Sequence, residues 1–174
     1  MKLYPLVIMS IFLIFAISGC SNSLNVQKQK MTKEEVNKII SETDNKSRIS
    51  KEMWKKVLDK KVYDILWNKG TERPFTGELL NEKREGTYVS AGCEIPVFSS
   101  EDKFESGSGW PSFTKAVDEG NIILKKDWSL GFPRTEVLSK CGEHLGHVFN
   151  DGPKDKGGKR FCINSKALKF VPKS

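Results

Sequence analysis

The sequence predicts a mainly β domain with helices at its N-terminal side. The hydrophobic pattern of the sequence changes at Thr71. Before it, apolar residues recur at helical spacing, and after it, short apolar runs are separated by glycine and proline. Short apolar runs between turn residues are typical of antiparallel strands. A length of 174 residues suits one domain with an appendage. We therefore expect a helical segment over residues 32–70 and a compact β domain over residues 71–174.

The amino-acid composition excludes several classes of protein. The chain has 29 basic and 22 acidic side chains, a formal charge of +7, and 37% hydrophobic residues. Such a content supports a packed core, and it excludes a polytopic membrane protein and a wholly disordered chain. The lysines are scattered without aromatic interleaving, which argues against nucleic-acid binding. Four cysteines in a chain of this length exclude a disulfide-dense mini-protein.

The first 19 residues resemble a lipoprotein signal peptide. Thirteen of the fifteen residues 3–17 are apolar, and a single cationic Lys2 precedes them. The run ends in Ile17-Ser18-Gly19-Cys20, which resembles the lipobox of bacterial lipoproteins, where the chain is cut before the cysteine and its thiol carries a diacylglycerol. The alternative is an uncleaved anchor helix with an incidental cysteine. We expect a protein that is lipid-anchored through Cys20 to the extracytoplasmic side of the cell membrane.

Two helical patterns follow the signal segment. Residues 20–31 lack apolar periodicity and are interpreted as a lipidated, flexible tether. Thr32 and Glu35 form a capping-box pattern ahead of Val36 and Ile40, which predicts a short helix. Apolar residues from Met53 to Leu66 then recur at helical spacing, and Gly70 is expected to end that pattern. We interpret the apolar stripe as core packing.

The remaining apolar runs are candidate strands. They occupy residues 88–89, 95–98, 122–124, 145–149, 161–163 and 168–171. Glycine and proline separate most of these runs, so each is expected to pair with a neighbour through a turn or loop. No internal repeat is found. The predicted architecture is therefore one β-rich domain.

The segment Lys159–Ser165 contains the most informative pattern in the chain. In a strand, alternation places Arg160, Cys162 and Asn164 on one face and Phe161 and Ile163 on the other. The first face is a polar row around a thiol, and the second is a core face. A guanidinium beside a cysteine favours its nucleophilic thiolate form. From this motif alone, a buried structural cysteine remains the alternative to a nucleophile.

The two histidines of the chain lie together in His144-Leu145-Gly146-His147. Residues three apart in a regular strand point to opposite faces, so a shared site requires a β-bulge. Gly146 is a residue that permits one. Taken by themselves, paired histidines are metal ligands, acid/base groups or hydrogen-bonded polar residues at a rim, and the motif does not choose among these.

Five motifs in register resemble those of the B-type peptide methionine sulfoxide reductases, over about 100 residues from Thr71 to Pro172. They are Arg73–Gly77, Ser106–Phe113, Arg134–Val137, His144–Phe149 with Asp151–Pro153, and Arg160–Asn164. The resemblance implies a methionine sulfoxide reductase B-like fold of two antiparallel β-sheets. It also implies reduction of methionine-R-sulfoxide in peptides and proteins, with a thioredoxin-like reductant.

Roles for individual residues follow from the same motif matches. Cys162 would be the nucleophile and would become a sulfenic acid. A sulfoxide oxygen is a poor leaving group until it is protonated, so an imidazole near the thiolate suits the chemistry. The other matched positions are His147 and Asn164 holding the sulfoxide oxygen and water, His144, Asp151 and Arg160 shaping the electrostatics, and Trp110 forming an apolar wall for the S-methyl group.

The chain departs from the family pattern at the structural zinc site. Many members hold zinc with two Cys-x-x-Cys pairs, whereas the matching positions here are Ser90 with Cys93 and Leu138 with Cys141. Structural zinc normally has four ligands, so we expect no zinc and no other cofactor. Two thiolates of such a site lie close enough for a small adjustment to join them. We therefore expect a disulfide between Cys93 and Cys141 where the protein matures oxidatively, with two reduced thiols as the alternative.

The resolving cysteine of some relatives is also absent. Their cysteine lies in the loop before the Trp-Pro, but the loop here, Ser106–Gly109, has none. Direct reduction of the sulfenic acid by an external thiol is therefore at least as well supported as resolution by Cys93 or Cys141. Two rival functions remain at this stage. One is a thiol hydrolase that uses Cys162 with a histidine base, and the other is a binding lipoprotein that has lost activity together with its metal.

Overall fold

The computed structural model describes residues 31–174. The predicted signal peptide, the tether and Cys20 lie outside these residues, apart from Met31 at the end of the tether. Within the described part of the chain, no helix has the length and apolar content needed to cross a bilayer. Residues 31–174 form one compact unit.

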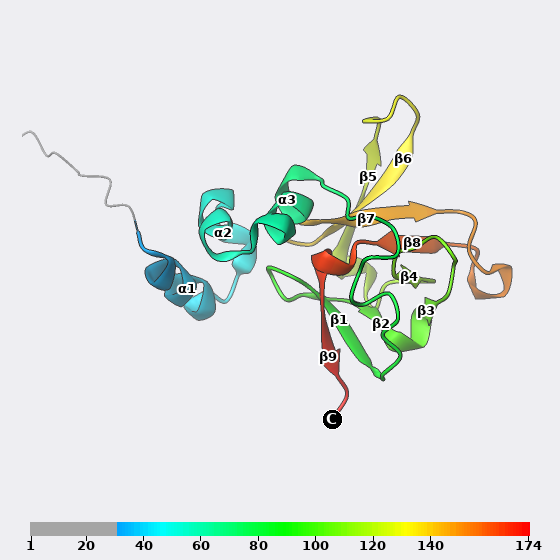
Figure 1. The fold of residues 1–174 in the computed structure, drawn as a ribbon, viewed down its shortest axis with the longest axis horizontal. Helices are drawn as coiled ribbons and strands as arrows, with labels where there is room; N and C mark the ends of the chain where they lie inside the picture. The colour runs from blue at the N-terminus through cyan, green and yellow to red at the C-terminus, as the bar shows by residue number, and fades with distance from the viewer. Residues whose placement is uncertain (1–30) are drawn as a thin grey trace, which may run out of the picture. The chain divides into compact units, whose positions relative to one another are not determined.

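Helices precede the sheets, as expected, and the described residues contain three of them where two helical patterns were predicted (Figure 1). They are α1 (Lys33–Glu42), α2 (Lys51–Val57) and α3 (Lys60–Asn68). The predicted capping box is present, since Thr32 Oγ1 accepts the amide of Glu35 at 3.2 Å and the Glu35 carboxylate accepts the amide of Thr32 at 2.7 Å. The sequence thus specifies the start of α1 to the residue.

The second helical pattern is two helices rather than one. Leu58 is extended and ends α2, and Asp59 caps α3 by accepting the amide of Lys61 at 2.8 Å. The apolar stripe stays in phase across the break, which is why spacing alone does not reveal it. At the end of α3, Lys69 takes the left-handed conformation (φ 57°), and the amide of Gly70 donates to the Asp64 carbonyl at 3.0 Å. Gly70 therefore lies one residue beyond the cap.

In the described part of the chain, nine strands form two antiparallel sheets, as the family resemblance implies. The first sheet has the order β2-β1-β9, and the second has the order β3-β4-β8-β7-β6-β5. The strands are β1 (Gly86–Ser90), β2 (Pro96–Ser99), β3 (Lys103–Phe104), β4 (Ser112–Phe113), β5 (Ile122–Asp127), β6 (Arg134–Ser139), β7 (His144–Phe149), β8 (Arg160–Ile163) and β9 (Leu168–Pro172). All six predicted runs are strands, whereas β3, β4 and β6 were not predicted.

Two apolar clusters hold the unit together. The main core includes Phe98 and Phe113, whose rings stack with centroids 4.5 Å apart, and Leu66 of α3, which is buried among residues from both sheets. A second cluster packs Val36 of α1 and Trp54 of α2 against Cys93. Helix α3 is therefore part of the β core, while α1 and α2 cover the corner around Cys93.

Candidate active site

Cys162 lies in the middle of the six-stranded sheet. Its strand, β8, runs between β4 and β7, and Cys162 pairs directly with Ser112 on one side and with His147 on the other. The alternation predicted for this strand is present, because Phe161 and Ile163 are buried in the core while Cys162 is half-buried on the other face. The register of β7 and β8 places the thiol across from an imidazole.

A β-bulge brings the two histidines together, as the sequence required. Leu145 has no partner on β6, so the alternation of β7 is reset between His144 and His147. The two imidazole rings lie with their centroids 5.5 Å apart. Gly146 is needed for a second reason: a Cβ atom there would lie 2.1 Å from the carbonyl oxygen of Cys162. The strands β7 and β8 therefore approach closely only because this residue is glycine.

A pocket of about 110 Å³ opens beside the thiol. Trp110 forms one wall, and its indole N–H donates to the Glu72 carbonyl at 3.1 Å. This hydrogen bond fixes the plane of the ring and leaves its apolar face toward the pocket. The lining residues are Thr71, Trp110, Arg134, Gly146, His147, Phe149, Cys162 and Asn164. Four predicted site residues thus line the pocket, whereas His144, Asp151 and Arg160 do not.

Burial has a larger effect on the pKa of the Cys162 thiol than the nearby charge of Arg160 has. Burial raises the pKa of the Cys162 thiol, while the Ser108 hydroxyl, 3.7 Å from Sγ, and the Arg160 guanidinium lower it only in part. The guanidinium lowers the pKa of the thiol, as predicted from the sequence, but desolvation raises it by more. Burial therefore favours the neutral thiol form of Cys162 over the thiolate. Ser108, on the Ser106–Gly109 loop, is a contact that the sequence analysis did not identify.

Arg160 is held in place from two sides. Its Nε and Nη2 atoms donate to the two carboxylate oxygens of Asp151 at 2.9 and 2.8 Å. The guanidinium also lies over the Phe149 ring, 4.6 Å from its centroid. The guanidinium in turn lowers the pKa of the Asp151 carboxyl, so this ion pair persists at neutral and mildly acidic pH. A bidentate, stacked arginine keeps its charge at a fixed place beside β8.

His147 is oriented by a carboxylate that the sequence analysis missed. Its Nε2 atom lies 2.8 Å from Oδ2 of Asp127, and the same oxygen accepts Nη2 of Arg134 at 2.7 Å. The hydrogen bond from His147, supported by the Ser129 amide and Arg134, holds the pKa of the Asp127 carboxyl far below its usual value. With Nε2 directed at Asp127, Nδ1 is the ring nitrogen left for a ligand in the pocket.

His144 has a different environment, because it is buried and does not reach the pocket. Its Nδ1 atom lies 2.8 Å from Oε1 of Glu136, and Oε2 of Glu136 accepts Lys69 Nζ at 2.7 Å. Burial lowers the pKa of His144, so its imidazole is neutral at pH 7. Burial opposes the ionisation of Glu136, but Lys69 and His144 outweigh it and lower the pKa of the carboxyl. His144 is therefore placed to orient the bulge rather than to touch a substrate.

Asn164 connects three segments of the site. Its Nδ2 atom donates to the Leu145 carbonyl at 3.0 Å, and its Oδ1 atom accepts the Glu72 amide at 3.1 Å. The side chain therefore fixes the bulge residue of β7 and the loop that carries Glu72. One N–H of the amide group is left over for a ligand, since the nitrogen carries two hydrogens.

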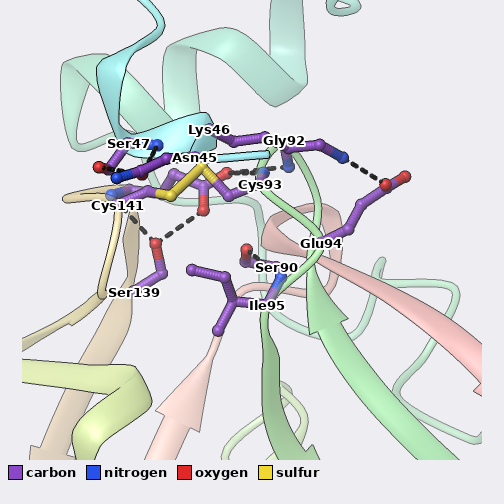
Figure 2. Close-up of a disulfide and its surroundings, with 11 residues drawn as sticks. Asn45, Lys46, Ser47, Ser90, Gly92, Cys93, Glu94, Ile95, Ser139 and Cys141 are labelled. Carbon is purple, nitrogen blue, oxygen red and sulfur yellow. Dashed lines mark hydrogen bonds and ion pairs between the residues drawn. A yellow bond between two sulfur atoms is a disulfide. The ribbon is translucent and has the colours of Figure 1, made fainter. Parts of the chain in front are cut away.

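Cys93 and Cys141 are joined in a disulfide, and neither of them lines the pocket (Figure 2). Their Cα atoms lie 6.6 Å apart, and the bond closes a loop of 48 residues. Beside it, the fully buried Glu143 accepts the amides of Gly92 at 2.9 Å and Cys93 at 3.0 Å, and the Ser139 hydroxyl at 2.7 Å. The β1–β2 turn and the β6–β7 turn are thus clamped covalently and by a carboxylate.

Family members with two Cys-x-x-Cys pairs would hold zinc at the corner that contains this disulfide. The residues present at the corner do not fit a zinc ion. Cys93, Cys141 and Glu143 bring three potential ligand atoms within 4.8 Å of one another. Both sulfurs, however, are consumed by the disulfide, and the carboxylate already accepts three hydrogen bonds. A tetrahedral zinc site needs deprotonated thiolates and a fourth ligand.

The histidine partners that the sequence did not predict are two acidic residues on neighbouring strands, β5 and β6. Asp127 ends β5 and Glu136 lies within β6, and the six-residue β6 was not predicted as a strand. Without β6, the register that sets Glu136 opposite His147 and beside His144 is not available. The available signal was the Arg134–Val137 motif, which included Glu136 without a role for it.

The fold and the pocket define a thiol enzyme: a half-buried cysteine faces an oriented histidine across neighbouring strands. A family model described as the SelR domain matches residues 58–172. Relatives named "Peptide methionine sulfoxide reductase MsrB" are 57% identical in Leptospira interrogans, over 70% of this chain and 92% of theirs, and 52% identical in Bradyrhizobium diazoefficiens, over 75% and 94%. A third, from Alteromonas mediterranea, is 48% identical over 74% and 92%.

The chain belongs to the SelR family, the B-type methionine sulfoxide reductases. The matched region begins within the helical segment and includes all of α3, in keeping with the place of that helix in the core.

Proposed function

We propose that this protein reduces methionine-R-sulfoxide in peptides and proteins, with Cys162 as the nucleophile. The observation that carries the proposal is the pairing of Cys162 with His147 across β8 and β7, at one small pocket walled by Trp110. The apolar wall suits an S-methyl group, and the two polar side chains suit a sulfoxide. The names and the high identity of the relatives favour this reaction over acyl hydrolysis by a thiol hydrolase that uses Cys162 with a histidine base.

The chemical step balances with the residues present. The Cys162 thiolate attacks the sulfoxide sulfur and forms a sulfur–sulfur bond, while Nδ1 of His147 passes a proton to the sulfoxide oxygen. The protonated oxygen leaves the substrate sulfur and bonds to the sulfur of Cys162, the sulfur–sulfur bond breaks, and methionine is released, so that Cys162 is left as a sulfenic acid. The cysteine sulfur supplies the two electrons. We propose that the step needs no metal.

An external thiol then restores the enzyme. Among the described residues, Cys162 is the one free cysteine, because Cys93 and Cys141 are bonded to each other. The disulfide also lies under α1 and α2, whose Val36 and Trp54 pack against Cys93. We therefore propose that a dithiol reductant of the thioredoxin type attacks the sulfenic acid, releases water, and resolves the mixed disulfide with its second thiol.

A single-turnover assay tests the proposed function. The protein is mixed with R- and S-sulfoxide peptides without reductant, and the oxidation state of each cysteine is mapped by mass spectrometry. We expect one methionine per enzyme from the R form and a sulfenic acid on Cys162. C162S should abolish the reaction without loss of fold. More than a few per cent of wild-type turnover in C162S would refute the assignment, as would turnover of the S form alone.

We also propose that the mature protein is lipid-anchored at the extracytoplasmic face of the membrane. The support is the Ile17–Cys20 lipobox and the apolar run before it, which lie outside the described residues. The wild-type protein should partition into detergent, and C20A should accumulate as an unprocessed precursor. Recovery of a soluble, unacylated mature form from wild-type cells would contradict this proposal.

A further inference from the structure

Three large apolar side chains are exposed at the tip of the β5–β6 hairpin. Trp128, Leu130 and Phe132 are 60%, 60% and 55% exposed, and they lie within six residues of loop, 128–133, which we call the apolar loop. In Figure 1 the hairpin projects from the rest of the fold. Clustered large apolar side chains left in water usually mark an interaction surface.

The loop is held open by its own hydrogen bonds. Oδ1 of Asp127 accepts the Ser129 amide at 3.0 Å, and the Gly131 amide donates to the Trp128 carbonyl at 3.0 Å. Gly131 takes a left-handed conformation (φ 79°), which glycine adopts without steric cost. The Arg134 guanidinium bonds the Ser129 hydroxyl at 3.2 Å. A turn built this way presents its side chains outward instead of letting them collapse onto the sheet.

The apolar loop is continuous with the catalytic pocket. Asp127, which precedes it, bonds His147, and Arg134, which follows it, lines the pocket. On the Trp110 side of the same pocket, Phe75 is 69% exposed, and its amide donates to the Gly109 carbonyl at 2.8 Å. Phe75 has φ 65°, a conformation that is costly for an aromatic residue and recurs at functional sites. Exposed apolar side chains therefore flank the pocket on two sides.

We infer that the apolar loop binds the apolar side chains that neighbour the oxidised methionine in a polypeptide substrate. The inference rests on the proposed function and gives it a substrate preference. A free amino-acid sulfoxide fills the pocket but lacks flanking residues. A peptide that enters the pocket with its methionine sulfoxide carries its neighbours past Phe75 or past the apolar loop. Apolar neighbours of the methionine sulfoxide then become buried from water against Trp128, Leu130 and Phe132. This burial strengthens binding of the peptide.

The experiment compares three substrates with the full-length protein. They are an oxidised-methionine peptide with leucine and phenylalanine neighbours, the same peptide with serine neighbours, and N-acetyl-methionine-R-sulfoxide. The test variant carries W128S, L130S and F132S. The matched control carries I123S and L124S, two side chains of β5 that are exposed on the same hairpin and lie outside the apolar loop.

In the test variant we expect the ratio of kcat/KM for the apolar peptide to that for the small sulfoxide to fall about tenfold, mainly through KM. That fold-change corresponds to about 1.4 kcal/mol. The ratio for the serine peptide and all ratios in the control should stay as in the wild type. An unchanged ratio for the apolar peptide would overturn the inference, whereas a wild-type enzyme inactive on all three substrates would refute the proposed function instead.

A lipid surface is the alternative binding partner of the apolar loop, and a vesicle-binding experiment distinguishes it from a peptide. Wild type and test variant are sedimented with vesicles of phosphatidylglycerol and phosphatidylcholine, using chains that begin at Ser21 so that neither the acyl anchor nor the apolar signal segment contributes; residues 31–174 form one compact unit by themselves. We expect equal sedimentation of the two proteins. Loss of vesicle binding in the test variant, together with an unchanged peptide ratio, would assign the apolar loop to the membrane and overturn the inference.

Discussion

Nε2 of His147 lies 2.8 Å from Oδ2 of Asp127, the last residue of β5. The contact joins the catalytic strand β7 to a residue two strands away in the same sheet. The contact also decides which ring nitrogen of His147 is free. Because Nε2 is hydrogen-bonded to Asp127, only Nδ1 can contact a substrate. Asp127 is therefore a positioning residue that acts through His147.

Asp127→Asn should lower the rate of sulfenic acid formation about 10- to 100-fold, since a hydrogen bond to a charged partner contributes about 1.5–3 kcal/mol. The asparagine keeps the shape of the side chain but removes the carboxylate charge that faces the His147 ring. Stopped-flow measurements give the rate of sulfenic acid formation in D127N, in H147A and in the double variant. Because Asp127 acts through His147, the double variant should be no slower than H147A alone. A further loss in the double variant would argue against this role.

The two histidines should differ in their effect on the chemical step. His147→Ala removes the group facing the pocket and should slow sulfenic acid formation by about 10²- to 10⁴-fold, the usual range for a lost general acid. His144→Ala should do less, because His144 is buried against Glu136 and does not line the pocket. Rapid-quench assays on both variants give the comparison. A larger effect at His144 would reverse the assigned roles.

The reactivity of Cys162 should rise with pH, and the midpoint of the rise should lie at a higher pH than for a free cysteine. Burial raises the pKa of this thiol, so alkylation by iodoacetamide should reach half its maximum above the value of about 8.5 for a free cysteine. Removing a group that lowers the pKa should displace the curve further, so Ser108→Ala and Arg160→Met should both move it to higher pH. Lys159→Met, at an exposed neighbour of Arg160, is the matched control and should leave it in place. A downward shift in either variant would contradict the electrostatic assignment.

The sequence predicted the parts of the site that depend on local rules. The alternation around Cys162 follows from the two-residue period of a strand, and the bulge at Leu145 follows from the need to bring His144 and His147 together. The start of α1 follows from the capping box at Thr32. Each of these features is decided by residues within a few positions of one another.

The parts that were missed depend on contacts between distant segments. Asp127 is 20 residues from His147 in the chain, and only the register of β5, β6 and β7 brings them together. Strand β6 itself, Arg134–Ser139, mixes charged and apolar residues because its inward-facing Glu136 is paired with His144 and Lys69. Burial of a paired carboxylate removes the apolar pattern by which a strand is recognised in sequence.

Glu143 should contribute strongly to stability. Glu143→Ala leaves the amides of Gly92 and Cys93 buried without a partner, at about 1–3 kcal/mol for each group. Urea unfolding should therefore show a loss of about 2–6 kcal/mol, and Glu143→Gln, which keeps one acceptor oxygen, should lose less. Glu94→Gln, on the same turn, removes exposed ion pairs to Lys46 and Lys169 and should cost less than about 1 kcal/mol. Equal losses at Glu143 and Glu94 would contradict the clamp.

The last prediction concerns the Cys93–Cys141 disulfide as the replacement for a zinc clamp. The bond joins the β1–β2 turn to the β6–β7 turn, the two segments that four thiolates would otherwise hold through a metal. It closes 48 residues, so the chain-entropy model gives about 4 kcal/mol of stabilisation at most. Export to an oxidising compartment is the setting in which such a bond persists. Reduction should therefore lower the urea midpoint of the protein, and a C93S/C141S variant should start at that lower value and not respond to reductant.

The chemical state of the two cysteines is measured on full-length protein that carries C20S and C162S and is matured under oxidising conditions. After unfolding in the presence of a thiol reagent, we expect no titratable thiol, and metal analysis should find less than stoichiometric zinc. Two titratable thiols would show that the bond does not form, and one equivalent of bound zinc would show that the corner still takes a metal. Either result would overturn the replacement, whereas a reductant-dependent midpoint with no zinc would establish that a covalent bond now holds the corner next to His144.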